Sequence, residues 1–126
     1  MTLGEAIFLV DELKPNQVET ARKIEWLSWL DQRVFDEIIC THQGDENTPE
    51  NFTGYSQDTD QDTVLLIPAP YDEVYRFYLE MEIDRVNLEN DKYNDDALLF
   101  NNAWGQYARK YHREHRPLIG QLTHRF

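Results

Sequence analysis

The sequence predicts an all-α fold with four helices, a long acidic loop over about residues 43–63 and a short extended segment at residues 64–67. Two observations predict it. Apolar residues recur at helical spacing over most of the chain, and the compact apolar run at 64–67 has no obvious second strand to pair with. This run is therefore a short strand or an extended plug in the core. With 126 residues, we expect one helical domain spanning 1–126.

The first helix is expected over about residues 3–13. Thr2 and Glu5 form the T-x-x-E pattern of a capping box at its start. Pro15 ends it, because the residue before a proline is pushed out of the helical region.

The second helix is expected from Asn16, which forms an N-x-x-E start signal with Glu19, to about Thr41. Gly44 just beyond is a plausible terminator. The helix carries one broad apolar stripe, made of Ile24, Leu27, Leu30, Val34, Phe35 and Ile38. Asp31 projects from inside this stripe, and Trp29 projects away from it.

The third helix is expected over about residues 72–87, with Glu82 near the centre of its apolar stripe. The polar stretch 87–94 predicts a turn, and Asn94 is the candidate N-cap of a fourth helix that ends near Glu114. The fourth helix has the most regular apolar seam of the chain: Tyr93, Ala97, Phe100, Trp104, Tyr107 and Tyr111. Because the same phase extends back to Leu79, one unbroken helix of more than about forty residues is the alternative.

Charge is distributed unevenly along the chain, whose formal net charge is −12. Residues 97–126 have a net charge of +4, whereas residues 1–96 have −16. The basic residues of this C-terminal part are Arg109, Lys110, Arg113, Arg116 and Arg125. They either complement the dipole of a helix C-terminus or meet acidic residues of a second copy in a head-to-tail contact. The acidic remainder disfavours binding to nucleic acid.

Two carboxylates sit inside apolar stripes, where an unpaired charge would cost several kcal/mol. We expect tyrosine hydroxyls, or an arginine such as Arg85 or Arg109, to satisfy Asp31 and Glu82 in the core or at a subunit seam. General acid–base chemistry at these two groups is the alternative. Trp29 indicates a partner surface, because tryptophan is enriched at the centre of interfaces; packing under the loop is the alternative.

Signals for a metal or a catalytic site are weak. The spacing of Asp58, Asp60 and Asp62 opens a calcium-binding pattern that then fails. His112 and His115 could share a zinc ion, but no third ligand is placed beside them. Cys40 is the single cysteine, and no nucleophile or nucleotide-binding motif is present. We expect no enzyme activity, cofactor or metal, and no apolar run predicts a membrane span or a signal peptide.

Most of the chain outside residues 43–57 resembles a family of small phage proteins. The matching segments are T-L-G-E-A-I and V-D-E-L-K-P-N-Q near the start, K-I-E-W-L-S-W-L-D-Q-R-V at 23–34, D-T-D-Q-D-T-V-L-L-I-P-A-P-Y-D-E-V-Y at 58–75, and F-N-N-A-W-G-Q-Y-A-R-K-Y-H-R-E-H-R-P at 100–117. They resemble the head–tail connector, or adaptor, proteins encoded by tailed phages and prophages of Gram-positive bacteria. Related sequences usually have a polar residue at the position of Trp29.

The resemblance implies a mostly helical virion protein without enzymatic activity. Such connectors assemble head to tail into a ring on the portal vertex, and their partners are copies of themselves and other head and tail proteins such as the portal. It places the protein in the bacterial host cytoplasm during assembly and then in the virion. A phage regulator or assembly chaperone that binds proteins outside the virion has the same acidic helical composition and is the alternative.

Overall fold

The computed structural model describes residues 1–118 and forms a helical body, as predicted. Its elements are α1 (Leu3–Leu13), α2 (Thr20–Arg33), the π-helix η1 (Val34–Ile39), α3 (Glu73–Val86) and α4 (Asn90–Glu114). No strand occurs among these residues, only isolated bridges between Thr2 and Val64 and between His42 and Pro117. In the same part of the chain, no helix combines the length and apolar character that a membrane crossing requires.

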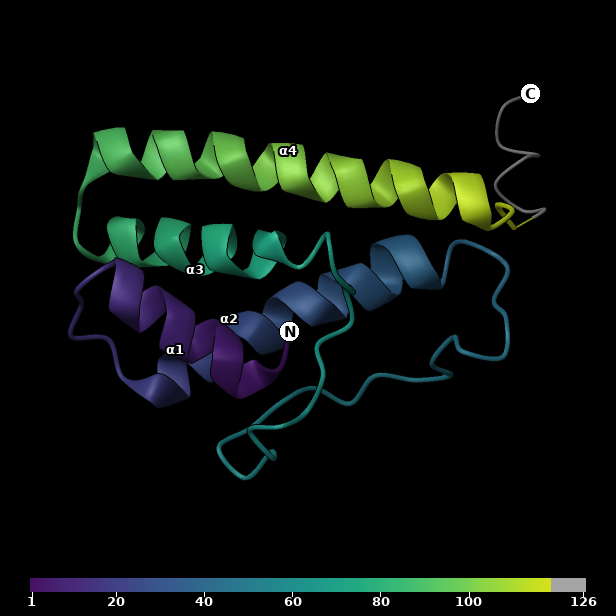
Figure 1. The fold of residues 1–126 in the computed structure, drawn as a ribbon, viewed down its shortest axis with the longest axis horizontal. Coiled ribbons are helices and arrows are strands. Elements are labelled where there is room, and N and C mark those ends of the chain that lie inside the picture. Colours follow the sequence, from purple (N-terminus) through teal and green to yellow (C-terminus); the bar gives the residue numbers. More distant parts are fainter. Residues whose placement is uncertain (119–126) are drawn as a thin grey trace.

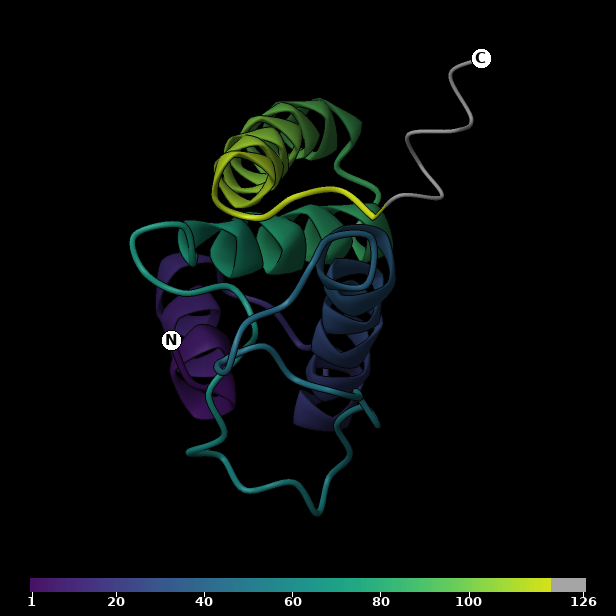
Figure 2. The same cartoon turned by 90° about the vertical axis from the view of Figure 1, so that its right-hand side faces the viewer.

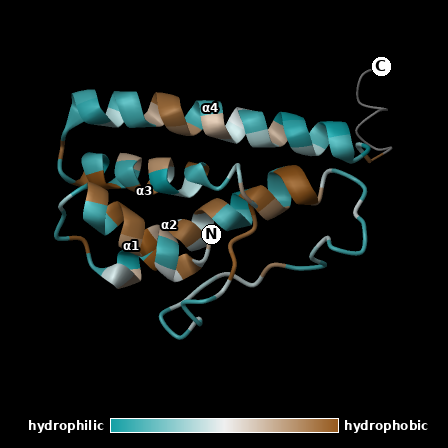
Figure 3. Cartoon of the chain, viewed as in Figure 1, coloured by the Kyte–Doolittle hydropathy of each residue, from teal (hydrophilic) through white to brown (hydrophobic). Residues whose placement is uncertain are grey.

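The helices stack in layers with α3 in the middle (Figure 1). Helix α3 contacts α1, α2 and α4, and α4 runs antiparallel along it. Hydrophobic residues are more frequent on α1 and α2, whereas α4 is mostly hydrophilic (Figure 3). The core therefore lies between α3 and the α1–α2 pair, and α4 covers it with an aromatic seam that buries Phe100, Tyr107 and Tyr111.

The predicted capping box is present at the start of α1. The backbone N–H of Glu5 donates to Thr2 Oγ1 at 3.2 Å, and the backbone N–H of Thr2 donates to Glu5 Oε1 at 3.0 Å. Together they satisfy two of the N–H groups that a helix start leaves without partners.

The predicted start of the second helix at Asn16 is wrong, because α2 begins at Thr20. The Asn16 side chain instead accepts a hydrogen bond from the backbone N–H of Val18 at 3.0 Å and donates one to the carbonyl of Lys14 at 2.9 Å. An asparagine that bonds the backbone two residues on forms a turn, which competes with a helix start. The last part of the expected helix is the π-helix η1, followed by a 2.8 Å bond from the N–H of Cys40 to the carbonyl of Phe35.

The predicted N-cap at Asn94 and the alternative of one unbroken helix are also wrong. Helices α3 and α4 are separate, and α4 begins at Asn90. Between them Leu88 has a positive φ of 58°, which an L-residue adopts in a turn but not within a helix. The chain reverses at this point, so the seam of α4 folds back onto α3.

The stretch between η1 and α3 contains no helix or strand. It follows the lower side of the body in Figure 1 and returns to the core at residues 65–67. Leu65 and Ile67 are buried, whereas Val64 is exposed. The N–H of Leu65 donates to the carbonyl of Met1 at 3.0 Å, and the N–H of Leu3 donates to that of Thr63 at 2.9 Å. These bonds join the segment to the chain start without forming a sheet.

Candidate interaction site

The C-terminal part of α4 and the residues directly after it present an exposed group of arginines, which we call the basic end: Arg109, Arg113 and Arg116. None of the three has an ion-pair partner among residues 1–118. Lys110, the fourth predicted cation of this end, is half-buried, pairs with Glu114 at 3.0 Å and lies 5.5 Å from the centre of the Tyr71 ring. Arg125 lies outside the described residues. Among the described residues, the three arginines of the basic end therefore have no ion pair that would compete with a contact to another molecule.

The opposite charge collects on another part of the chain. Residues 34–72 contain nine carboxylates and no lysine or arginine. Asp58, Asp60 and Asp62 form an exposed acidic turn within this stretch. In Figure 2, α4 forms the top of the molecule and the middle of the loop its bottom, with the helical body between them, whereas the start of the loop contacts the end of α4. The basic end of one copy therefore cannot be neutralised by its own acidic turn.

Asp31 is fully buried, where its place in the apolar stripe predicts it. Tyr75 donates its hydroxyl to Asp31 Oδ1 at 2.6 Å, and Tyr55 donates to Oδ2 at 2.5 Å. The backbone N–H of Leu66 donates to the same Oδ2 at 3.1 Å. Burial raises the pKa of Asp31, and the three hydrogen bonds act in the opposite direction.

The Asp31 bonds connect three separate parts of the chain. Tyr55 and Leu66 belong to the long connection, Asp31 to α2 and Tyr75 to α3. The hydroxyl of Tyr75 also accepts a bond from the N–H of Ile67 at 2.7 Å. Burial and then the charge of Asp31 raise the pKa of Tyr75 well above its ordinary value, so its hydroxyl keeps the donated proton. Asp31 fixes the loop on the helical body and has no exposed surface of its own.

Glu82 differs from the prediction of a core carboxylate. Its side chain keeps 13% of its surface exposed at the edge of α3. Both Nε and one terminal nitrogen of Arg85 donate to Glu82 Oε2, at 2.8 and 2.6 Å. Arg85 was one of the expected partners, but the pair lies at the surface because position 82 falls beside the buried faces of α3.

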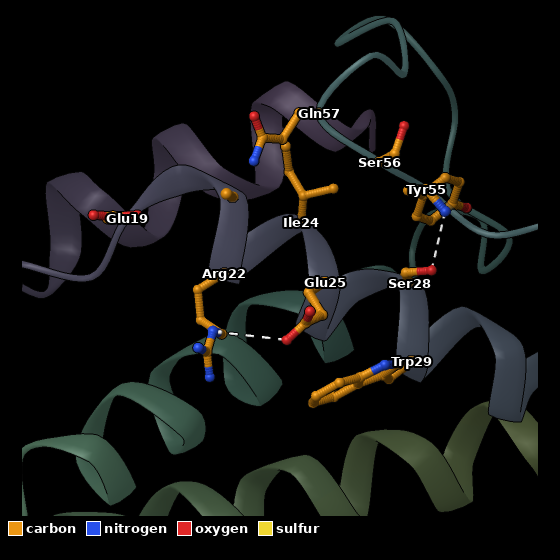
Figure 4. A pocket seen from close by; sticks show the side chains of 10 residues that line it. Glu19, Arg22, Ile24, Glu25, Ser28, Trp29, Tyr55, Ser56 and Gln57 are labelled. Atoms are coloured by element: carbon orange, nitrogen blue, oxygen red, sulfur yellow. Dashed lines mark hydrogen bonds and ion pairs between the residues drawn. The ribbon is translucent and has the colours of Figure 1, made fainter.

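Trp29 lies beside a groove between α2 and the loop. The groove has a volume of about 490 Å³ and is lined by Glu19, Ala21, Arg22, Ile24, Glu25, Ser28, Trp29, Tyr55, Ser56 and Gln57. Figure 4 shows the loop residues on one side of it and the indole of Trp29 on the other. Trp29 is 52% exposed, so the loop does not cover it. We call this feature the Trp29 groove.

The loop wall of the groove is held by two bonds to α2. The N–H of Tyr55 donates to Ser28 Oγ at 3.0 Å, and its hydroxyl reaches Asp31. Gly54, the residue before Tyr55, has a positive φ of 88°, and a Cβ at this position would lie 3.0 Å from the same Ser28 oxygen. Residue 54 is therefore glycine where the chain must approach α2 closely. The groove is a preformed part of the fold.

His112 and His115, the two histidines considered as zinc ligands, have different neighbours. His112 Nδ1 lies 3.3 Å from His42 Nε2, whereas His115 Nε2 lies 3.5 Å from an Asp45 carboxylate oxygen. His42 Nδ1 donates to the carbonyl of Ile38 at 2.7 Å. Within residues 1–118, no three or more histidine, cysteine, aspartate or glutamate side chains are grouped to hold a metal ion. The contacts instead attach the start of the loop to the end of α4.

A partly buried charged cluster that the sequence analysis missed joins three helices. Lys14, directly after α1, places Nζ 2.5 Å from Asp84 Oδ1 on α3 and 3.5 Å from Asp96 Oδ2 on α4. Asp84 has no exposed surface. Burial, and then hydrogen bonding and repulsion from Asp84, raise the pKa of Asp96 to about 6. One lysine faces two carboxylates, and this cluster belongs to the framework rather than to a surface site.

Comparisons with known protein families, curated proteins and solved structures find no match for this chain.

Proposed function

We propose that this protein is a phage head–tail connector, a virion assembly protein that forms a head-to-tail ring at the portal vertex and carries out no catalysis. The resemblance of its framework segments to such connectors suggests this role. Its partners are further copies of itself and other head or tail proteins such as the portal. It acts in the host cytoplasm during assembly and then as part of the virion.

The observation that carries the proposal is the separation of the basic end from the acidic turn, although the start of the loop at Asp45 lies beside His115 at the end of α4. Arg109 and Arg113 lie in the last turns of α4 and Arg116 follows the helix, whereas the acidic turn lies across the molecule (Figures 1 and 2). Two different surfaces that complement each other make a heterologous contact, and such contacts close into a ring when the rotation between copies permits it.

The long acidic loop suits this role as a contact surface. Asp31 anchors it through Tyr55 and Leu66, while the residues between these anchors are largely exposed. An acidic surface also lets DNA pass without adhering to it, because like charges repel. The extended segment at 64–67 holds the loop to the core through Leu65 and Ile67.

Analytical ultracentrifugation in low and high salt tests self-association. Screening shortens the reach of charge from about 10 Å at 0.1 M salt to about 3 Å at 1 M. We expect a concentration-dependent oligomer at low salt that dissociates at high salt. Association that is insensitive to salt would contradict the role of the charged surfaces.

Mass spectrometry of purified phage particles tests the place of action. A connector is expected in the particles at a fixed ratio to the portal. Its absence from particles, together with its presence in infected cells, would overturn the proposal in favour of a binding module that works outside the virion.

A further inference from the structure

We propose that the basic end of one copy docks in the Trp29 groove of a second copy, with a guanidinium stacked on the indole of Trp29. This inference rests on the proposed self-association and names the two surfaces that meet. Arg109 and Arg113 are the two residues of the basic end that we propose to dock.

The groove has the chemistry that a guanidinium needs. Trp29 presents half of its surface beside a hollow of about 490 Å³, and tryptophan is the side chain on which a cation binds best. Glu19 and Glu25 are exposed carboxylates of its lining. The one cation of the lining, Arg22, lies 3.7 Å from Glu25 as an ion pair. The net charge of the lining therefore favours an incoming cation.

The loop extends this acidic surface beyond the groove. Gln57 lines the groove, and the acidic turn begins at the next residue, Asp58. A docked arginine would thus approach through a region of negative potential, which speeds association and selects a basic partner. The half-exposed indole of Trp29 supplies the apolar contact of this region. An apolar anchor surrounded by charge is the usual arrangement of an interface hot spot.

The basic end matches this surface in chemistry and spacing. Arg109 and Arg113 are four residues apart on α4, so they lie on one face of the helix about 6 Å apart. Both are exposed, and neither has an ion-pair partner in the part of the chain that the structure describes. Arginine is more weakly hydrated than lysine and stacks on aromatic faces. The groove of the same copy does not include either residue, so the contact that we propose joins two copies.

A charge-exchange experiment tests the contact directly. One variant carries Glu19→Arg with Glu25→Arg, and the other carries Arg109→Glu with Arg113→Glu. In each variant alone, like charges face each other, so we expect monomers in ultracentrifugation at low salt. In an equimolar mixture, contacts between the two variants join opposite charges, and we expect association to return.

The control variant carries Glu12→Arg with Asp91→Arg, which changes the net charge as much as the groove variant does. Both residues are exposed and lie outside the groove lining. We expect this variant to associate by itself. Equal loss of association in the control and in the groove variant would overturn the inference, because net charge alone would then explain the effect.

Trp29→Ala tests the stacking separately from the charges. We expect association to weaken at least about 30-fold, the smallest effect of an interface hot spot. Phe8→Ala is the matched control, because Phe8 is a large apolar side chain that is 65% exposed on α1. An unchanged association constant for Trp29→Ala would refute the stacking.

The outcomes separate this inference from the proposed function. If the unchanged protein assembles but the charge-exchange mixture stays monomeric, the docking site is wrong and the connector role stands. If the unchanged protein stays monomeric at low salt and high concentration, docking between copies is overturned. The connector role then depends on the particle analysis alone.

Discussion

Replacing Asp31 by asparagine tests how the loop is held to the helical body. The carboxylate accepts three hydrogen bonds, from Tyr55, Tyr75 and the backbone of Leu66. An asparagine keeps one oxygen, which can still accept the bonds of Tyr55 and Leu66. Its NH₂ group then faces the hydroxyl of Tyr75, whose proton has lost its acceptor.

The expected loss of stability follows from this buried hydroxyl. Leaving one buried polar group without a partner costs about 1–3 kcal/mol, and a bond to a charged acceptor is worth about 1.5–3 kcal/mol. Removing the buried charge offsets part of this loss, because burial raises the pKa of Asp31 and so disfavours its ionised form. We therefore expect the free energy of unfolding to fall by about 2 kcal/mol.

Urea unfolding measures this change. With a slope of about 2 kcal/mol per M urea, a loss of about 2 kcal/mol lowers the midpoint by about 1 M. Asp36→Asn is the matched control, because Asp36 is an exposed carboxylate that accepts one bond, from Gln32, at 3.0 Å. We expect the control to stay within about 0.5 kcal/mol of the unchanged protein. A loss below about 0.5 kcal/mol for Asp31→Asn would refute the reasoning.

Three further predictions concern the framework. Because burial and Asp84 raise the pKa of Asp96 to about 6, above about 3.9 in the unfolded chain, the folded state binds more protons between these values. The free energy of unfolding, measured in urea titrations, should fall as pH rises from about 4 to 6. If Asp96→Asn showed the same change of stability with pH, the assignment of this change to Asp96 would be contradicted. Lys14→Met leaves the buried Asp84 without its cation and should cost about 3–5 kcal/mol by urea unfolding; a loss below about 1 kcal/mol would argue against the pair. Gly54→Ala should lower the melting temperature, because residue 54 has a positive φ that costs an L-residue about 1–2 kcal/mol. The control Gly105→Ala, within α4, should raise it, and equal effects of the two substitutions would count against backbone strain.

The helical class could be predicted from periodicity because each helix buries an apolar face. The capping box at Thr2 and the burial of Asp31 also follow from local spacing. Asp84 was missed because α3 is covered on two sides, and only one stripe was considered. Phe77, Met81 and Asp84 follow at spacings of four and three along a second stripe of α3. This stripe could be recognised as buried only once the contacts of α3 with the other helices were known.

Other features depend on contacts between distant parts of the chain. Tyr55 lies in a polar stretch without periodicity, so nothing nearby in the sequence indicates its bond to Asp31, 24 residues away. Asn16 carries a valid helix-start signal, yet its side chain satisfies a turn instead. The Trp29 groove likewise needs both α2 and the loop wall, although the exposure of Trp29 follows from its position off the stripe.

The two attachments to Asp31 make the stretch from residue 56 to 65 a bounded segment of the surface. Tyr55 and Leu66 hold its two ends to one side chain, so the chain enters and leaves this segment at neighbouring points. Lengthening such a segment adds little entropic cost, because closure entropy grows only with the logarithm of length. A foreign peptide inserted between residues 57 and 58 should therefore be displayed without unfolding the helices beneath it, because it leaves intact the carbonyls of Gln61 and Thr63 that accept bonds from the start of α1.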